Sequence, residues 1–214
     1  MTAQNKTQSY KTDQEKFWAE EFGTDYIDRN TVSGNVPARL KLFARILERT
    51  SDIDDIFEFG ANIGNNLHAL RALLPSAKLK ALEINDDAVK TLNSYGWLSE
   101  VHHGSMLESD FENCTDMSFT SGVLIHINPD SLKAAYQQLY KASRKYVMIC
   151  EYYNPKPVTI PYRGHDDRLF KRDFAGDMMD MFPDLKLIDY GFAYHRDPKF
   201  PMDDLNWFLM EKDK

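Results

Sequence analysis

The sequence predicts an α/β protein with a Rossmann-like, seven-stranded sheet, helices on both faces and additional N-terminal helices. Short apolar runs alternate with segments of helical periodicity from about residue 50 to 152, which implies parallel strands joined by helices. Two more strand-like runs, 185–195 and 205–212, follow near the end of the chain, and the segment between them suits a hairpin-like connection. We therefore expect the last strand to be antiparallel.

The elements follow from local signals taken in chain order. Aromatic residues at Phe17, Trp18 and Phe22 lie near helical spacing and predict a helix over 12–22. Pro37 suits the first turn of a second helix, whose apolar residues fall on one face. The first five strands are then expected near 55–60, 78–84, 100–103, 117–123 and 145–152.

Capping residues support two of the helices expected between these strands. Asn85 can accept hydrogen bonds from the free amides of one helix, and Asn128 followed by Pro129 suits the start of another. After the fifth strand, residues 152–172 are expected to form a long loop. A helix over 174–182 and the last two strands complete the chain.

Composition indicates a single domain with a small-molecule partner. The 214 residues, 43% of them apolar and 13% aromatic, suffice for one packed core. The formal charge of -7 disfavours a general nucleic-acid binder, because such proteins neutralise phosphates with Lys and Arg. No apolar run reaches the roughly 18 residues of a membrane span and no secretion signal is present, so we expect a cytoplasmic protein without a membrane partner. Cys114 and Cys150 are expected to be reduced, and no spacing of His, Cys and carboxylates indicates a metal site. The oligomeric state stays open.

The segment 57–66, FEFGANIGNN, carries the strongest functional signal. An apolar strand ends there in a turn with Gly60 and Gly64, which lets the backbone approach a ligand and aims helix amides at it. Glu83, at the end of the next strand, is placed to accept both hydroxyls of a ribose. This pattern predicts an adenosine-containing cofactor. Asn62 stands where the dinucleotide fingerprint has a further glycine, which disfavours a pyrophosphate.

Glu58 narrows the choice of cofactor, because it lies two residues before the turn and shares a strand face with Gly60. A carboxylate beside an anionic pyrophosphate is unfavourable, whereas beside a sulfonium or an ammonium group it is attractive. We therefore expect S-adenosyl-L-methionine rather than a nicotinamide dinucleotide. The residues expected to contact it in this part of the chain are Glu58, Gly60, Ala61, Asn62, Gly64, Asn65, Glu83 and Ile84.

Further motifs follow the glycine turn along the chain. They are Glu83, then GSML at 104–107, then SFTSGVLIHINPD at 118–130. Together with the turn, these motifs resemble those of class I S-adenosylmethionine-dependent methyltransferases over about 50–152. The resemblance implies a seven-stranded sheet with a reversed last strand. It also implies that Ser105 and Met106 flank the adenine and that the segment from Val123 through Leu124 to His126 lines the methyl-donor pocket.

Four distinctive segments lie over nearly the whole chain. They are FWAEEFGTDYIDRN at 17–30, GVLIHINPD at 122–130, EYYNPKPVTIPYRGHDDRLFKRDFAG at 151–176 and LNWFLMEK at 205–212. These segments look like those of methyltransferases associated with pseudaminic acid biosynthesis. The resemblance implies a role in nonulosonic acid or surface-glycan metabolism.

The loop after the fifth strand is expected to form a substrate wall, because loops at the carboxyl ends of parallel strands meet the ligands of such sheets. Residues 163–172 carry four basic and two acidic side chains, a formal charge of +2. This charge predicts an anionic acceptor held by forked arginine hydrogen bonds. As an alternative, these cations pair with Asp166, Asp167 and Asp173 in a solvated network. The expected substrate residues are Tyr26, Arg29, Asn30, Tyr153, Asn154, Arg163, His165, Arg168, Lys171 and Arg172.

His126 is the leading candidate for a general base, since it follows the fourth strand and stands at the mouth of the expected site. Glu151, Tyr152 and His165 are alternatives. An oxygen acceptor needs a base, whereas a deprotonated amine does not, so the assignment depends on the acceptor.

The chain therefore divides into an N-terminal helical cap at 1–50, a cofactor-binding core at 51–152, and a substrate loop with the C-terminal strands at 153–214. The expected function is methyl transfer from S-adenosyl-L-methionine to an anionic sugar or sugar-nucleotide-like small molecule. An alternative is a non-catalytic sensor or partner subunit that binds the cofactor or its demethylated product. The polar loop at 151–172 favours the enzyme, because a binding module does not require it.

Overall fold

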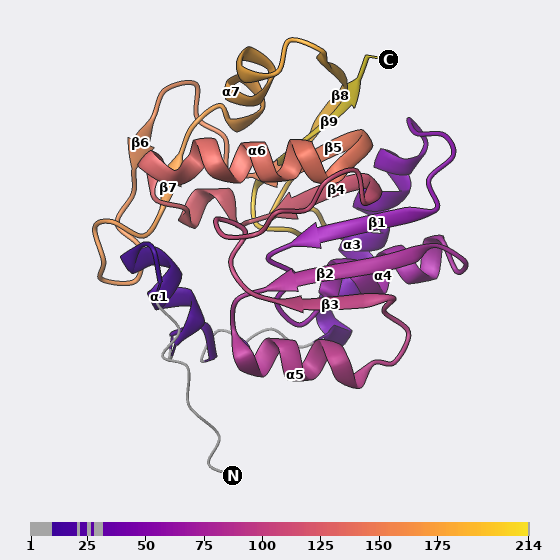
Figure 1. The fold of residues 1–214 in the computed structure, drawn as a ribbon, viewed down its shortest axis with the longest axis horizontal. Helices are drawn as coiled ribbons and strands as arrows, with labels where there is room; N and C mark the ends of the chain where they lie inside the picture. Colours follow the sequence, from indigo (N-terminus) through magenta and orange to yellow (C-terminus); the bar gives the residue numbers. More distant parts are fainter. Residues whose placement is uncertain (1–9, 21, 25–26, 28–31, 214) are drawn as a thin grey trace.

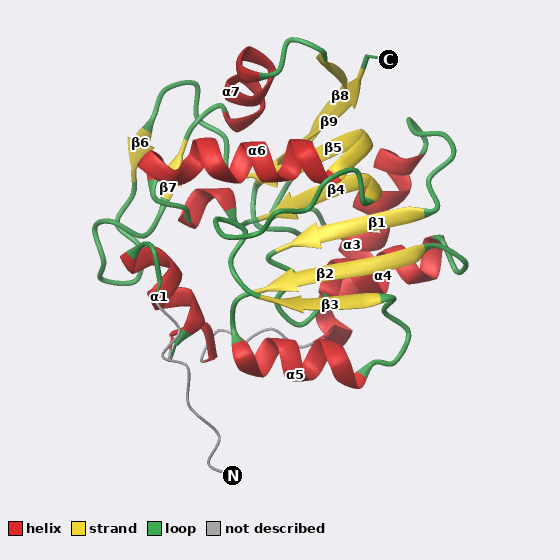
Figure 2. Ribbon diagram, in the orientation of Figure 1, coloured by secondary structure: helices red, strands yellow, loops and turns green. Residues whose placement is uncertain are grey.

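The computed structural model describes residues 10–20, 22–24, 27 and 32–213. Its centre is a seven-stranded mixed sheet in the order β3-β2-β1-β4-β5-β9-β8 (Figures 1 and 2). The strands are β1 (Asp55–Phe59), β2 (Lys78–Glu83), β3 (Glu100–His103), β4 (Thr115–Ser121), β5 (Ser143–Glu151), β8 (Leu185–Ala193) and β9 (Leu205–Lys212). The first five pair in parallel, and β9 runs antiparallel to both β5 and β8. The predicted sheet with an antiparallel last strand is confirmed.

The fourth strand begins and ends two residues earlier than the sequence predicted. Gly122 adopts a left-handed φ of +69°, and the 3₁₀ turn Leu124–His126 follows, so the chain leaves the sheet after Ser121. The register pairs Glu58 of β1 with Ala81 of β2 on one side and with Phe119 of β4 on the other. The carboxyl ends of β2, β1 and β4 therefore lie at one edge.

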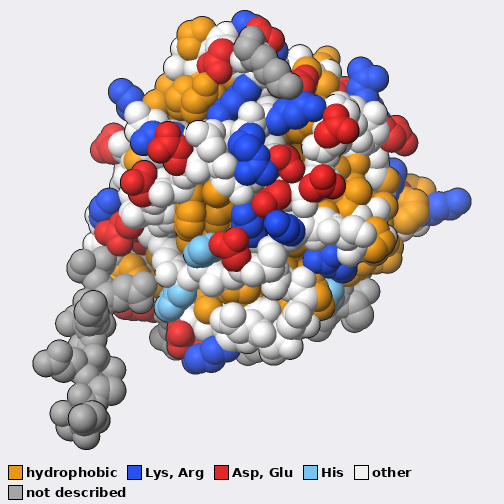
Figure 3. Space-filling model, turned by 45° about the vertical axis from the view of Figure 1, so that its right-hand side comes forward, with side chains coloured by type: hydrophobic (Ala, Val, Ile, Leu, Met, Phe, Trp, Pro, Cys, Tyr) orange, Lys and Arg blue, Asp and Glu red, His pale blue; other side chains and the backbone are white. Residues whose placement is uncertain are grey.

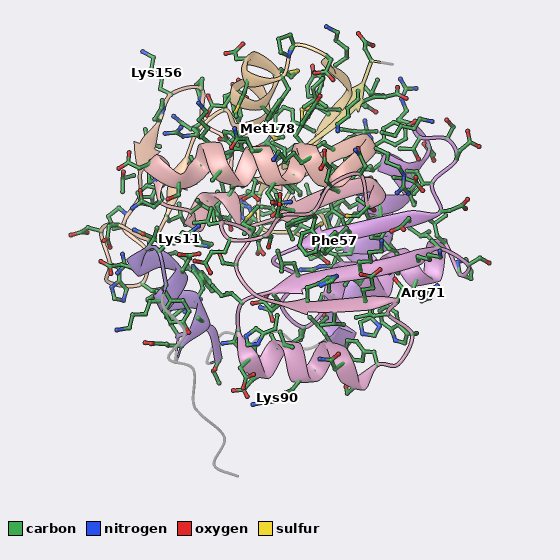
Figure 4. All side chains as sticks on the ribbon, viewed as in Figure 1. Lys11, Phe57, Arg71, Lys90, Lys156 and Met178 are labelled. Carbon is green, nitrogen blue, oxygen red and sulfur yellow. The ribbon has the colours of Figure 1, made fainter. Side chains whose placement is uncertain are left out.

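Helices cover both faces of the sheet. The helices α3 (Val32–Leu47), α4 (Asn65–Leu73) and α5 (Asp86–Ser94) contribute to one apolar core, and α6 (Leu132–Ala142) and α7 (Phe174–Met181) contribute to the other. Strand β1 serves both cores, with Ile56 in the first and Phe57 in the second, as the alternation of a strand requires. Phe57 and Met178 are both fully buried in the second core (Figure 4).

Helix α3 begins at Val32, five residues before Pro37, so the prediction that Pro37 opens this helix is wrong. Pro37 lies in the second turn of α3, inside the helix, where its missing N–H removes one backbone hydrogen bond. The predicted apolar face is present, since Phe43 and Ile46 are fully buried. The predicted caps are also present: Asn85 accepts from the amides of Asp87 and Ala88, and Asn128 accepts from that of Asp130 before the 3₁₀ turn Pro129–Ser131.

The helix that precedes the sheet and the loop that follows β5 meet at the carboxyl edge of the sheet. Helix α1 (Asp13–Ala19) is shorter than the predicted helix and starts at a capping box formed by Thr12 and Glu15. The segment predicted as a loop contains a short antiparallel pair, β6 (Val158–Thr159) with β7 (Phe170–Lys171). Figure 1 shows α1 and this pair at the left, where the arrowheads of β1, β2 and β3 end.

The surface carries charges of both signs, and on the face in Figure 3 the Lys and Arg side chains lie among Asp and Glu side chains. Cys114 and Cys150 are both free thiols. Among the described residues, no helix has the length and apolar character that crossing a membrane requires.

Candidate functional site

A cavity of about 230 Å³ lies at the carboxyl edge of the parallel strands. Its wall follows the sheet order. The lining residues are Glu83, Ile84 and Asn85 at the end of β2 and directly after it, Glu58, Gly60, Ala61 and Asn62 at the end of β1, Ser121, Gly122 and Val123 at the end of β4 and directly after it, Tyr152 after β5, and Asp203 and Leu205 at the amino end of β9. Helix α1 and the loop after β6 close over it. The cavity is therefore placed where ligands of parallel sheets bind.

The glycine turn has the backbone conformation that its sequence predicted. Gly60, Asn62 and Gly64 all have positive φ, at +77°, +48° and +79°. A Cβ atom on Gly60 would lie 2.5 Å from Val123 Cγ2, so only glycine fits between the turn and the segment after β4. Gly64 is the N-cap of α4 and does not line the cavity, whereas Asn65 does. The turn therefore shapes the floor of the cavity with bare backbone.

Glu83 is buried, and both oxygens of its carboxylate accept backbone hydrogen bonds. Oε2 accepts from the amide of Asn62 at 2.7 Å, and Oε1 accepts from the amides of Ile84 and Asn85 at 2.8 Å each. Burial raises the pKa of Glu83, and these amides oppose the shift. The bonds lock the carboxylate at the cavity wall and tie the glycine turn to the end of β2.

Glu58 is also buried, with 1% of its surface exposed, and only one of its oxygens is paired. Oε1 accepts from Asn66 Nδ2 at 2.6 Å, and Asn66 Oδ1 accepts in turn from Arg39 Nε at 2.9 Å. No hydrogen-bond partner exists among the described residues for Glu58 Oε2 or for the nearby Asn65 Oδ1, although both atoms are buried. Burial raises the pKa of Glu58 to about 8. The cavity wall therefore contains two buried oxygen atoms without a partner among the described residues, and the carboxyl group that carries one of them keeps its proton at neutral pH while no ligand is bound.

Helix α1 contributes side chains to the cavity that the sequence analysis missed. Glu15 is buried; its Oε2 accepts from the amide of Thr12, and its Oε1 accepts from the hydroxyl of Ser105. Trp18 lines the same cavity. Glu15 forms the capping box Thr12-x-x-Glu15, which is visible in the sequence, but nothing in that motif shows that the helix lies over the sheet edge. Ser105 and Met106 both line the cavity.

His126 lies in the cavity wall between two aromatic rings. Its ring is 4.5 Å from that of Trp18 and 5.2 Å from that of Tyr162, measured between centroids. Nδ1 lies 2.6 Å from the carbonyl oxygen of Arg168, and since a carbonyl only accepts, Nδ1 carries the proton and Nε2 stays an acceptor. Burial lowers the pKa of His126 to about 4. The imidazole is therefore neutral and weakly basic at neutral pH.

Glu151 does not line the cavity, in contrast to its predicted catalytic place. Its carboxylate accepts from the amides of Val123, Leu124 and Ile125 at 3.0, 3.1 and 3.3 Å. Burial raises its pKa to about 7, and these hydrogen bonds oppose the shift. Glu151 thus holds the turn after β4 in place. Leu124, predicted as a cofactor contact, is fully buried in the second core, whereas the sequence neighbours Val123, Ile125 and Tyr152 line the cavity.

The basic side chains predicted to hold an anionic acceptor do not line the cavity. Arg168 pairs with Asp167 at 2.6 Å, and Arg172 pairs with Asp177 at 3.3 Å. The Arg163 guanidinium lies over the ring of Tyr162, and the Lys171 ammonium lies over that of Tyr152. Ion pairing within the loop, the alternative raised from the sequence, accounts for Arg168, and Arg172 pairs with a carboxylate of α7.

The other predicted substrate residues also lie away from the cavity wall. Tyr153 is 40% exposed and packs near Phe208, the Asn154 side chain donates to the carbonyl of Lys156, and His165 contacts Phe17. Tyr26, Arg29 and Asn30 lie outside the described residues. The residues that the sequence analysis missed in the wall include Tyr162 and Asp203. Tyr162 stands in the distinctive segment 151–176, whose charged residues drew the prediction instead, and Asp203 stands in none of the quoted segments.

Comparison with known proteins identifies the fold. No protein-family model matches the sequence, and no curated protein matches it. Magnesium protoporphyrin IX methyltransferase from Synechocystis PCC 6803, solved with bound S-adenosylmethionine, is 12% identical, covers 96% of this chain and 100% of its own, and superposes with a TM-score of 0.63.

Two further solved structures agree. 1,6-Didemethyltoxoflavin-N1-methyltransferase from Burkholderia thailandensis, with its substrate and S-adenosylhomocysteine bound, is 12% identical over 90% of this chain and 83% of its own, with a TM-score of 0.63. An S-adenosylmethionine-dependent methyltransferase from Clostridium acetobutylicum is 10% identical over 90% of this chain and 98% of its own, with a TM-score of 0.64. The chain therefore has the fold of class I S-adenosylmethionine-dependent methyltransferases.

Proposed function

We propose that the protein is an S-adenosyl-L-methionine-dependent methyltransferase that acts on a small molecule. The observation that carries the proposal is the pair of buried oxygen atoms that lack a partner among the described residues, Glu58 Oε2 and Asn65 Oδ1, beside a glycine turn in the cavity. A buried polar atom without a partner costs free energy, so these atoms favour a ligand that brings N–H donors and positive charge. The ammonium of the methionine moiety is such a group, whereas a pyrophosphate is not.

The rest of the cavity wall fits the same ligand. Glu83 offers fixed carboxylate oxygens for ribose hydroxyls, and Ser105 and Met106 offer a polar and an apolar contact for the adenine. Arg39 lines the cavity beside Asn66 and Glu58, where its guanidinium suits the methionine carboxylate. Two of the solved methyltransferases with this fold, from Burkholderia thailandensis and Synechocystis PCC 6803, contain bound S-adenosylhomocysteine and S-adenosylmethionine, respectively.

The residues of this chain would contribute positioning and the exclusion of water. The cofactor, when bound, supplies an electrophilic methyl group on a sulfonium. Trp18, Val123 and Tyr152 then form an apolar wall that keeps water from the reacting atoms. Holding two reactants at attack distance supplies most of the acceleration that such a transfer needs. Glu58 is suited to the ammonium rather than the sulfonium, because a carboxylate at the sulfur would oppose its loss of charge.

Ligand-dependent unfolding tests the cofactor, and product mass tests the reaction. S-adenosylhomocysteine at 100 times its dissociation constant should stabilise the protein by about 2.7 kcal/mol, while NADH at the same concentration should leave the melting temperature unchanged. Transfer of an isotope-labelled methyl group to an added small molecule then separates the enzyme from a sensor. Stabilisation by NADH alone would refute the proposal, and cofactor binding without any turnover would support the sensor.

The acceptor, the metabolic pathway and the cellular location stay predictions from the sequence. An anionic sugar or sugar-nucleotide acceptor rested on the charge of residues 163–172, and the role in pseudaminic acid metabolism and the cytoplasmic location rested on the resemblance and the N-terminal composition. Screening pathway sugars and their nucleotide forms in the methyl-transfer assay tests the first two.

A further inference from the structure

Strand β8 forms an edge of the sheet. It lies at the opposite end of the strand order from β3, and of the described strands only β9 pairs with it (Figure 1). The backbone N–H and C=O groups on its outer side therefore have no strand partner among the described residues. β8 spans nine residues, whereas β3, the other edge strand, spans four and begins with Glu100. A long edge strand is a template for pairing with a further strand.

The carboxyl half of β8 lacks the residues that usually protect an edge, which are charged side chains and proline. Residues 190–194, YGFAY, contain neither, and the charged residue Asp189 precedes them. Tyr190, Phe192 and Tyr194 are 63%, 55% and 45% exposed, which makes them the three most exposed large apolar side chains among the described residues. This part of the edge is therefore both open and apolar.

The three rings lie on one face of the sheet. Side chains alternate between the two faces of a strand, so Tyr190 and Phe192 share a face, and the ring of Tyr194 lies 5.9 Å from that of Phe192. At about 200 Å² per aromatic side chain, the exposed fractions amount to roughly 300 Å² on each copy of the chain. Two copies would bury about 600 Å² of aromatic surface, roughly half of the 1,200 Å² at the lower end of stable interfaces. The strand backbones and flanking side chains add to this area, which fits a dimer that forms and dissociates.

Charge selects the register in which β8 can pair with a second copy of itself. An antiparallel pair of identical strands has a twofold axis, so the residue at the axis sets the register. A pair centred on Asp189 would place two carboxylates opposite each other, which is destabilising. A pair centred on Phe192 places the two Phe192 rings side by side and Tyr190 opposite Tyr194. Asp189 then lies opposite His195, so no like charges meet.

We propose that the chain forms a twofold-symmetric dimer in which the β8 strands of two copies pair antiparallel around Phe192. The sheet then continues from one copy into the other, and the outer backbone groups of residues 190–194 find partners. A second copy fits this edge better than a nucleic acid does, because the exposed rings offer no charge to phosphates. None of the three rings lines the cavity, so the dimer is independent of the proposed function.

Sedimentation velocity of the protein without ligand, between about 5 and 200 µM, tests for the dimer and should show a shift from monomer to dimer with concentration. Phe192→Glu places two carboxylates opposite each other at the axis and should raise the dissociation constant of the dimer at least about tenfold. Ile160→Glu, at an exposed apolar position outside β8, should leave this constant unchanged. A wild-type protein that stays monomeric at the highest concentration, or a dimer unaffected by Phe192→Glu, would overturn the proposal.

Disulfide cross-linking tests the register without adding a charge. Cys114→Ser serves as the background, since the other thiol, that of Cys150, is fully buried. In this background Phe192→Cys places two thiols opposite each other, with Cα atoms about 4.5–5.5 Å apart, which suits a disulfide. Tyr190→Cys is the matched control, because an offset of four residues separates its two thiols by roughly 13 Å. Mild oxidation should cross-link Phe192→Cys at least about tenfold faster than Tyr190→Cys, and equal rates would refute the pairing around Phe192.

Discussion

Glu58→Gln separates the effect of the buried carboxyl group on the free energy of unfolding from its effect on ligand binding. Glutamine keeps the shape of the side chain and an oxygen that can accept from Asn66, but it cannot ionise. Burial raises the pKa of Glu58 from 4.5 to about 8 in the folded protein, so the folded state keeps a proton that the unfolded chain loses. A raised carboxyl pKa is destabilising, and the stability of the unliganded protein therefore falls as pH rises from 4.5 to 8.

The size of the effect follows from the pKa change. Each pH unit between the two pKa values costs about 1.4 kcal/mol, which gives about 3 kcal/mol at pH 7 and about 5 kcal/mol at pH 9. Because Glu58 is 1% exposed, solvent screening does not reduce this value. Glu58→Gln should raise the free energy of unfolding relative to wild type by these amounts, and the gain should vanish near pH 4.

Urea unfolding of both proteins between pH 5 and 9, without ligand, measures this difference, and Glu112→Gln at an exposed position serves as the control. The substitution should have the opposite effect on ligand binding, which it should weaken, since a ligand with a cationic group favours the ionised carboxylate of Glu58. The variant should bind S-adenosylhomocysteine roughly 10- to 100-fold more weakly at pH 8. The ratio of the wild-type affinity to the variant affinity should become smaller below pH 7, because Glu58 of the wild-type protein must then release a proton when the ligand binds. A stability difference that does not change between pH 5 and 9 would refute the burial argument.

Three other substitutions or profiles test separate parts of the site. Glu83→Ala should abolish cofactor binding in calorimetry, because it removes both the ribose acceptor and the anchor of the glycine turn, and unchanged affinity would refute the ribose role. Gly60→Ala should lower the free energy of unfolding by more than about 1 kcal/mol, since the added Cβ would lie 2.5 Å from Val123 and the φ of Gly60 is +77°. Gly96→Ala is the matched control for the steric clash, because Gly96 has a similar φ of +65° but no close neighbour. Equal losses of stability in the two variants would contradict the clash at Gly60. The pH profile of kcat should lack an ionisation near 6.5, because burial lowers the pKa of His126 to about 4, and a limb between pH 6 and 7 that disappears in His126→Ala would contradict this assignment.

The sheet and the glycine turn could be predicted because their signals are local. Apolar runs of strand length alternate with capped helices, so each element carries its own boundary residues, such as Asn85 and Asn128. Gly60 needs a conformation that other residues rarely adopt, and Glu83 stands at a fixed distance along the chain from it. Pro37 misled the prediction of α3, since a proline near the amino end of a helix does not mark its first residue.

The acceptor side could not be predicted from residue type and position, because pairing decides what each side chain can do. Arg168 and Arg172 read as a basic patch in the sequence, but their guanidinium groups pair with Asp167 and Asp177. Glu151 is the last residue of β5, where a base could serve, but its carboxylate accepts hydrogen bonds from backbone amides. Asp167 is the sequence neighbour of Arg168, so that pairing could be raised from the sequence, whereas the amides that bind Glu151 follow β4 and meet it only in the folded chain. Among the described residues, the buried oxygen atoms of this cavity that lack a partner are Glu58 Oε2 and Asn65 Oδ1, which is why the site favours a ligand that brings N–H donors and positive charge.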